Sequence, residues 1–245
     1  MPIDPSQTLV GVAVFAGAIV CGFAGFAFSA VAGAILLHVM PPKEAVPFMM
    51  VCSVLLQGAA MLVLREHLQW RRAAALIVGG LAGLSPGLWL LQHVDTQAFR
   101  IGFGLFLAAY AVYMLFRPAL ARLREKPGAL GDASIGFGGG VIGGLTAMPG
   151  ALPTIWCDLS GIAKDAQRGL LQPYIAAMQV AALLLLFAVQ GVPQNLVAHL
   201  GAASPALVAG GAIGLALYGR VNDRMFRRAV LCALLASGIG FLGYR

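Results

Sequence analysis

Two glycine-rich stretches hold the residues whose types and spacing could do chemistry. We call Gly22–Ser29 the first tip and Gly143–Gly150 the second tip; the second contains three glycines, a threonine and a proline. Glycine and proline interrupt helices, so each tip is expected to end one helix and start another. The start of a helix presents unpaired N–H groups and a partial positive charge, which bind anions without a basic side chain. The tips therefore predict an anion site.

The residues expected to contact the anion come from both tips. They are Gly22, Gly25, Phe26 and Ser29 in the first, and Gly143, Gly144, Thr146, Pro149 and Gly150 in the second. Ser29 and Thr146 would add hydroxyl donors, and Pro149 suits an early helical position, where its missing N–H costs little. The alternative is that the glycines only let helices pack closely and that both hydroxyls bond to their own helices.

A second set of polar side chains lies in otherwise apolar segments. Ser53 and Gln57 share one helical face. Gln172 and Gln179 share another. These four could line a cavity, or they could hydrogen-bond between helices. An acid within a membrane is a candidate proton carrier, so Asp158 is a candidate for proton coupling. Its place near the end of its apolar segment equally suits a residue at the membrane surface.

The composition indicates a polytopic membrane protein made of helices. Of the 245 residues, 60% are hydrophobic and only 10% are charged, whereas about a quarter are charged in a soluble domain. The mean hydropathy is +0.89. The cysteines are scattered without metal-ligand spacing, and no nucleotide-binding or hydrolase motif is present. We therefore expect no metal, no cofactor, no enzymatic activity and no nucleic-acid partner, but a lipid bilayer and a small anionic substrate.

The order of apolar and polar segments predicts two repeats of one plan. Residues 1–117 form the first repeat, residues 118–130 a polar linker, and residues 131–245 the second repeat. Each repeat is expected to hold a broken glycine-rich helical hairpin and three transmembrane helices. The predicted hairpins are 8–40 and 131–163, and the predicted spans are 45–64, 73–91, 99–116, 169–189, 196–219 and 226–244.

The distribution of basic residues predicts the orientation of these segments. If each broken stretch enters the membrane and returns, four loops on one side hold 13 of the 16 Lys and Arg residues. The positive-inside rule makes that side cytoplasmic, with the 118–130 linker on it and both termini outside. Three spans follow each hairpin, so the halves run in opposite directions. Such inverted repeats bring their broken helices together near the midplane.

The glycine patterns resemble those of the TauE/SafE family of membrane transporters. The resemblance is carried by Gly22–Phe28, by Gly136–Gly144 and by the loop ending at Leu68–Arg71, and it covers essentially the whole chain. It implies a transporter of sulfite, sulfoacetate or another small sulfur-containing anion in the bacterial inner membrane. Phe26–Phe28 stands where the family favours glycines, which makes the first tip bulkier and more apolar.

A function of a different class is a non-transporting assembly or sensor subunit. In that case the tips would be packing motifs, and the basic cytoplasmic face would dock a partner. No soluble domain that could receive or send a signal is predicted, so transport is the preferred interpretation. An intramembrane enzyme that used Cys157 and Asp158 would lack a paired base at a suitable spacing.

Overall fold

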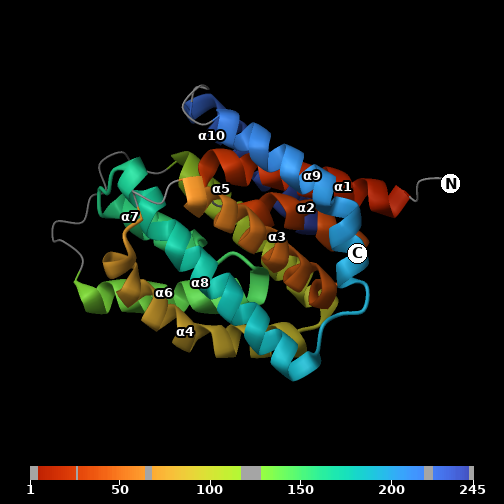
Figure 1. Cartoon of the computed structure of the whole chain (residues 1–245), viewed down its shortest axis with the longest axis horizontal. Coiled ribbons are helices and arrows are strands. Elements are labelled where there is room, and N and C mark those ends of the chain that lie inside the picture. The colour runs from red at the N-terminus through yellow and green to blue at the C-terminus, as the bar shows by residue number, and fades with distance from the viewer. Residues whose placement is uncertain (1–4, 26, 64–67, 117–127, 218–222, 243–245) are drawn as a thin grey trace. The chain divides into compact units, whose positions relative to one another are not determined.

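The computed structural model describes residues 5–25, 27–63, 68–116, 128–217 and 223–242. Within these ranges the chain is all-helical, as predicted. The helices are α1 Pro5–Ala24, α2 Phe28–Val39, α3 Pro42–Val63, α4 Trp70–His93, α5 Thr96–Phe116, α6 Ala129–Thr146, α7 Ala151–Leu159, α8 Lys164–Gln190, α9 Leu196–Leu217 and α10 Asp223–Leu242 (Figure 1).

Six of the described helices are long and apolar enough to cross a membrane, namely α1, α3, α4, α5, α8 and α9. The predicted spans from 45–64 to 196–219 overlap five of these helices. In α10 the described apolar stretch is shorter, Val230–Phe241. Both glycine-rich stretches interrupt a helix: α2 begins after α1 has ended at Ala24, and α7 begins after α6 has ended at Thr146.

The chain divides into two compact units that do not follow the halves of the sequence. Unit 1 comprises Met1–Cys52, Val94–Arg117 and Pro193–Arg245, and unit 2 comprises Ser53–His93 and Pro118–Val192. Each unit therefore combines helices from both predicted repeats. The long helix α3 contributes its first part to unit 1 and its second part to unit 2.

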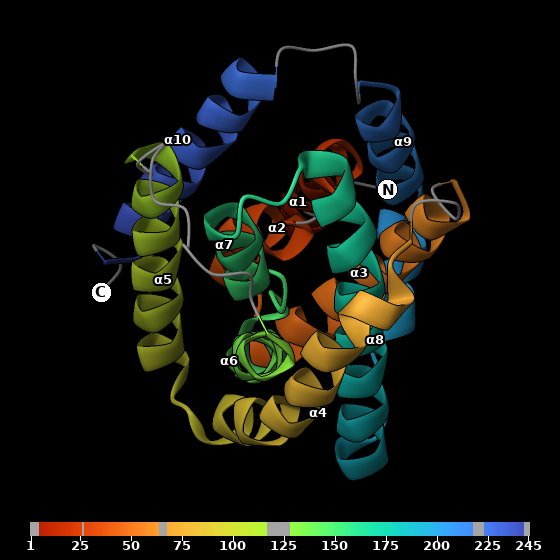
Figure 2. The same cartoon turned by 90° about the vertical axis from the view of Figure 1, so that its left-hand side faces the viewer.

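In unit 2, α4 and α6 lie side by side and run in the same direction (Figures 1 and 2). Contacts ascend together along the two helices: Gly79, Gly83 and Gly87 of α4 meet Ala133, Phe137 and Val141 of α6. A Cβ on Gly83 would strike the carbonyl of Phe137, and one on Gly140 would strike that of Gly80. Lipid gives helices little hydrophobic drive to associate, so such close backbone packing holds them together. The contact requires glycine at these positions, because a Cβ would collide with the backbone of the facing helix.

In unit 1, α1 and α9 form a comparable parallel pair. Gly210 lies against Phe15, and Gly214 lies against Ile19 and Gly22. The other close pair in this unit is α5 with α10, which run antiparallel side by side (Figure 2). In both parallel pairs, one helix comes from the first half of the sequence and the other from the second half.

A proline inside a helix has no N–H to donate to the carbonyl four residues earlier, so that carbonyl needs another hydrogen-bond donor. Two such carbonyls in this protein have one. Pro173 in α8 has no N–H for the carbonyl of Gly169, and the backbone N–H of Gln69 donates to that carbonyl at 3.0 Å. Pro205 in α9 leaves the carbonyl of Gly201 in the same way, and a serine hydroxyl one residue before the proline donates to it at 2.9 Å. The first of these bonds ties the start of α4 to the start of α8 in unit 2.

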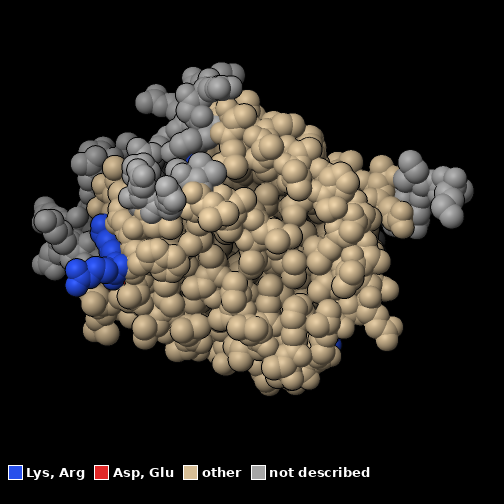
Figure 3. Space-filling view, viewed as in Figure 1, with Lys and Arg blue, Asp and Glu red and all other residues tan. Residues whose placement is uncertain are grey.

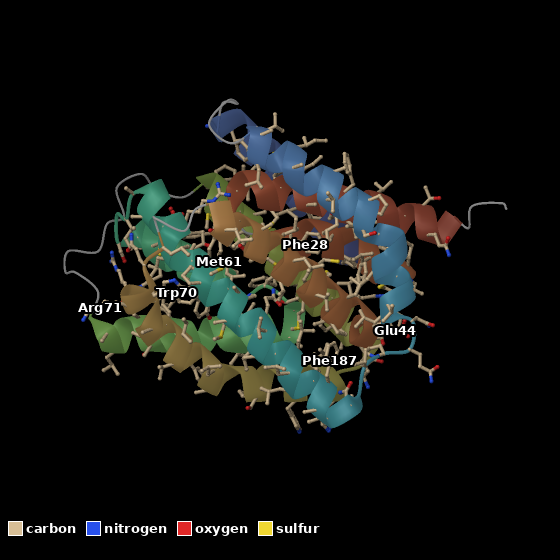
Figure 4. The ribbon with its side chains drawn as sticks, in the orientation of Figure 1. Phe28, Glu44, Met61, Trp70, Arg71 and Phe187 are labelled. Carbon is tan, nitrogen blue, oxygen red and sulfur yellow. The ribbon has the colours of Figure 1, made fainter. Side chains whose placement is uncertain are left out.

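The described surface of unit 2 is suited to lipid along its helices and to water at one end. Leu62 and Leu130 expose 79% and 83% of their surface. Exposing such apolar side chains to water would cost free energy, and contact with lipid avoids that cost. In Figure 3 blue side chains gather at the end where α4 begins. Figure 4 labels Trp70 and Arg71 at that end, and Phe187 toward the other end of α8.

Candidate functional site

The second tip is a tight turn between α6 and α7. The residue after α6, Ala147, has left-handed backbone angles of φ 59° and ψ 24°, and its N–H bonds to the carbonyl of Gly143 at 2.8 Å. A Cβ on Gly143 would lie 2.6 Å from the Cβ of Pro149, so the turn has no room for a larger residue there. Left-handed angles cost a non-glycine residue about 1–2 kcal/mol. Such a residue persists only where its surroundings hold it.

The start of α7 offers backbone donors. The N–H of Ala151 bonds to Met148 at 3.3 Å, and the N–H of Thr154 bonds to Gly150 at 2.9 Å. Pro153 has no N–H. Among the described residues, Gly150 and Leu152 are not donors in the backbone hydrogen bonds of this turn. Free N–H groups of this kind, together with the helix dipole, favour an anion.

α7 packs back along α6. The indole Nε1 of Trp156 donates to Asp132 Oδ1 at 2.7 Å, which joins the later part of α7 to the first turn of α6. Nearer the tip, a Cβ on Gly139 would meet the carbonyl of Pro149 at 2.8 Å and Pro153 at 3.1 Å. The two helices therefore run antiparallel from the tip.

One face of α8 lies against the second tip. The side-chain Nε2 of Gln179 donates to the carbonyl of Ala147 at 2.9 Å and lies 3.5 Å from Ser53 Oγ. Further back along α8, Gln167 Nε2 donates to the carbonyl of Thr154 in α7 at 3.2 Å. The structure thus brings together Ser53, Gln179 and the tip, three features singled out from the sequence.

Gln172 lies between these two contacts on α8. It precedes Gln179 by about two helical turns and so shares its face of α8. The side chain is 0% exposed, and neither amide atom has a hydrogen-bond partner among the described residues. Gln57, in α3 one turn after Ser53, is also buried. A buried amide without a partner is costly, so Gln172 is a candidate for contact with a ligand.

The two candidate hydroxyls differ in their bonding. Thr146 Oγ1 donates to the carbonyl of Ile142 at 2.7 Å, so its proton serves its own helix. This is the alternative that the sequence left open. Ser29 Oγ, by contrast, is buried and has no hydrogen-bond partner in the described part of the chain. Ser29 is the candidate hydroxyl donor that the structure leaves available.

The first tip has a similar backbone. Gly25 has φ 81° and donates to the carbonyl of Cys21 at 2.7 Å. Ala27, before α2, has left-handed angles of φ 75° and ψ 13° and makes no side-chain cap. Phe26 lies outside the described residues. Ser29 therefore sits in the first turn of a helix that starts from a strained alanine.

Two of the tip glycines have contacts that account for them by packing. A Cβ on Gly22 would lie 2.7 Å from the carbonyl of Gly211 in α9, and one on Gly144 would lie 2.9 Å from the carbonyl of Leu84 in α4. Each glycine lets two helix backbones approach. A role for these two glycines in binding stays a prediction from the sequence.

Two acids of unit 2 lie away from the tip. Asp158 occupies the last turn of α7, and Asp132 the first turn of α6. The bond between Trp156 and Asp132 places both at the end opposite the tip. Arg168 is buried near the start of α8. The described residues hold no group of three or more His, Cys, Asp or Glu side chains that could bind a metal ion.

The sequence interpretation missed Tyr174. Its hydroxyl donates to the carbonyl of Gly136 at 3.0 Å, which fastens α8 to α6. A tyrosine in the middle of an apolar span is a usable signal, because a buried hydroxyl needs a partner. The partner itself, a glycine carbonyl far away in the sequence, has no sequence signature.

Comparison with known families gives one match. The model of the family described as sulfite exporter TauE/SafE matches residues 9–241, nearly the whole chain. No curated protein matches, and no solved structure matches.

Proposed function

Because the chain belongs to the sulfite exporter TauE/SafE family, we propose that it is a secondary transporter that moves sulfite, sulfoacetate or another small sulfur-containing anion. The protein is an integral membrane member of a transporter family, with six apolar helices of sufficient length among those described. The sequence contains no nucleotide-binding motif, so the proposed transport is driven by gradients. The proposed location is the bacterial inner membrane.

The observation that carries the proposal is a buried polar group in each unit that has no hydrogen-bond partner among the described residues. One lies in the first turn of α2, after the first break, and the other lies on the face of α8 that also carries Gln179, whose amide bonds to the second break. Among the described residues, Ser29 Oγ in α2 and both amide atoms of Gln172 lack hydrogen-bond partners. Ala27 and Ala147 hold left-handed angles at the same two breaks. We assign anion binding to the starts of α2 and α7. That both tips serve one midplane site stays the prediction made from the sequence.

Close packing explains some glycines but not the breaks. The glycine contacts between α4 and α6, and between α1 and α9, would serve a non-transporting subunit equally well. A packing motif, however, has no use for a helix that stops at Ala147 and leaves Gln172 buried without a partner. These features favour transport over the alternative of an assembly subunit.

The packing of unit 2 supports the proposed topology. Helices α4 and α6 run in parallel, and the bond from Gln69 to Gly169 ties the start of α4 to the start of α8. Three helices that begin at one end suit basic loops on one side of the membrane, which we take as cytoplasmic. Cysteines placed at Ser6 and Gly128 in a cysteine-free variant should label from opposite sides; labelling from the same side contradicts this topology.

A flux assay tests the function. Purified protein in liposomes should carry labelled sulfite down its gradient faster than protein-free liposomes do. Gly150→Leu would place a side chain over the start of α7, and it should lower the flux while the protein still inserts and purifies. Equal fluxes with and without protein, over sulfite and several sulfonates, would refute the proposed function.

A further inference from the structure

We propose that the second tip also binds an alkali-metal cation, such as Na⁺, at the end of α6, and that this cation is carried together with the anion. The inference rests on the proposed function and adds the ion that is coupled to it. It concerns unit 2 alone, where the end of α6 lies against one face of α8 and the second part of α3.

The last turn of α6 has carbonyl groups whose usual donors are missing. In a continuous helix the carbonyl of Leu145 would accept a hydrogen bond from residue 149, but Pro149 has no N–H. The carbonyls of Gly144 and Thr146 would need the N–H groups four residues later, and neither of these donates in a backbone hydrogen bond between described residues. Gly144 and Thr146 are buried. Buried carbonyls need a partner, and at the negative end of a helix dipole they favour a cation.

Gln179 adds a side-chain oxygen to these backbone oxygens. Its Nε2 donates to the carbonyl of Ala147 at 2.9 Å, a bond that only the nitrogen of the amide can make. The Oε1 atom is bonded to the same carbon as Nε2, so it also lies beside the tip. The residue is 1% exposed, and Oε1 has no hydrogen-bond partner among the described residues. A cation bound to Oε1 would remove the cost of burying this acceptor.

The oxygens gathered here suit a singly charged metal ion. Ser53 Oγ lies 3.5 Å from Gln179 Nε2 and adds a hydroxyl oxygen from α3. Backbone carbonyls, an amide and a hydroxyl are all neutral, whereas Ca²⁺ and Mg²⁺ sites are usually built with carboxylates. The acids Asp132 and Asp158 lie at the opposite end of α6 and α7. Neutral carbonyl oxygens can replace the hydration shell of an alkali-metal ion.

The transported anion supplies the charge that balances this cation. Burying a cation among neutral groups is costly without an opposite charge. Only Ala147–Gly150 separates the end of α6 from the start of α7, where the proposed function places the anion. The buried cation Arg168 precedes Gln179 by eleven residues, about 16 Å along α8, which leaves the end of α6 to another cation. Each ion should therefore raise the affinity of the tip for the other.

Replacement of the external cation tests the inference. The flux of labelled sulfite is measured into liposomes that contain the full-length protein, in Na⁺, K⁺ or choline salts of equal ionic strength and pH. The more effective metal ion should raise the flux roughly tenfold over choline, which lies within the usual range of coupling between sites. Equal fluxes in the three salts overturn the inference and leave the proposed function standing. Absence of protein-dependent flux in every salt overturns both.

Variants of Gln179 and Ser53 locate the cation. Gln179→Leu removes Oε1, so the ratio of the flux in the metal salt to the flux in choline should fall to about one. A tip that is merely destabilised would lose flux in every salt and keep this ratio. Gln190→Leu, at an exposed position of α8, is the matched control and should also keep it. Ser53→Ala should lower the ratio. A wild-type ratio in Gln179→Leu, or in Ser53→Ala where the first variant cannot be purified, overturns the inference.

Discussion

Gln179→Leu tests whether α8 holds the second tip in its binding shape. The wild-type amide is 1% exposed and donates to the carbonyl of Ala147 at 2.9 Å. Leucine keeps the approximate volume but removes the donor, so the carbonyl of a left-handed residue is left buried without this bond. Both the stability and the geometry of the tip should suffer.

The expected loss of stability follows from that single bond. Leaving a buried acceptor unsatisfied costs about 1–3 kcal/mol. For a chain of this length, each kcal/mol lowers the melting temperature by about 2–4 °C. The sulfite flux should fall further than stability alone explains, because Ala147 no longer holds the start of α7 in place.

The assay measures thermal unfolding in detergent together with sulfite flux in liposomes. Gln190→Leu makes the same chemical change at an exposed position of α8 and should alter neither measurement. Gln179→Glu keeps the length of the side chain but puts an acceptor where the donor was, and it should be at least as damaging as leucine. A Gln179→Leu variant with wild-type melting temperature and flux would refute the reasoning.

Three further variants test other parts of the structure. Ala147→Gly removes a left-handed cost of about 1–2 kcal/mol, so its melting temperature should equal or exceed that of the wild type, whereas Ala147→Val should melt lower; a tolerated valine contradicts the left-handed turn. Gly140→Leu should abolish a monodisperse peak in size-exclusion chromatography because its side chain meets the backbone of α4, while Gly58→Leu, with nothing within 4 Å of its added Cβ, should not. Asp158→Asn should retain sulfite binding and remove the pH dependence of flux if this acid carries a proton; an unchanged pH profile argues against that role.

The all-helical membrane fold could be predicted from the sequence because bilayers impose strong rules on composition and length. Runs of about 20 apolar residues span the core, and glycine and proline mark where helices stop. The predicted break was Gly143–Gly150. In the structure α6 ends inside it, at Thr146, and α7 begins one residue after it, at Ala151. The length of a span and the position of a helix break depend on neighbouring residues in the chain, so both can be predicted from the local sequence.

The partner of each helix could not be predicted in this way. Gly136, Gly140 and Gly144 recur at every fourth residue, which indicates a face for close packing but does not name the helix that packs there. The structure shows α4 as that helix. Likewise the shared face of Gln172 and Gln179 was readable from their spacing, whereas the bond to Ala147 depends on how α8 lies against the tip.

The exchange of helices between the two halves has a consequence for how the protein is made. In unit 1 the partner of α1 is α9, and in unit 2 the partner of α4 is α6. While a ribosome has produced only the first half, the glycine faces of α1 and α4 are in the membrane with nothing to pack against. Pairing of α4 must therefore wait until α6 has been made, and pairing of α1 must wait until α9 has been made. Two half-chains produced together from separate messages should complement each other, while either half produced alone should be degraded.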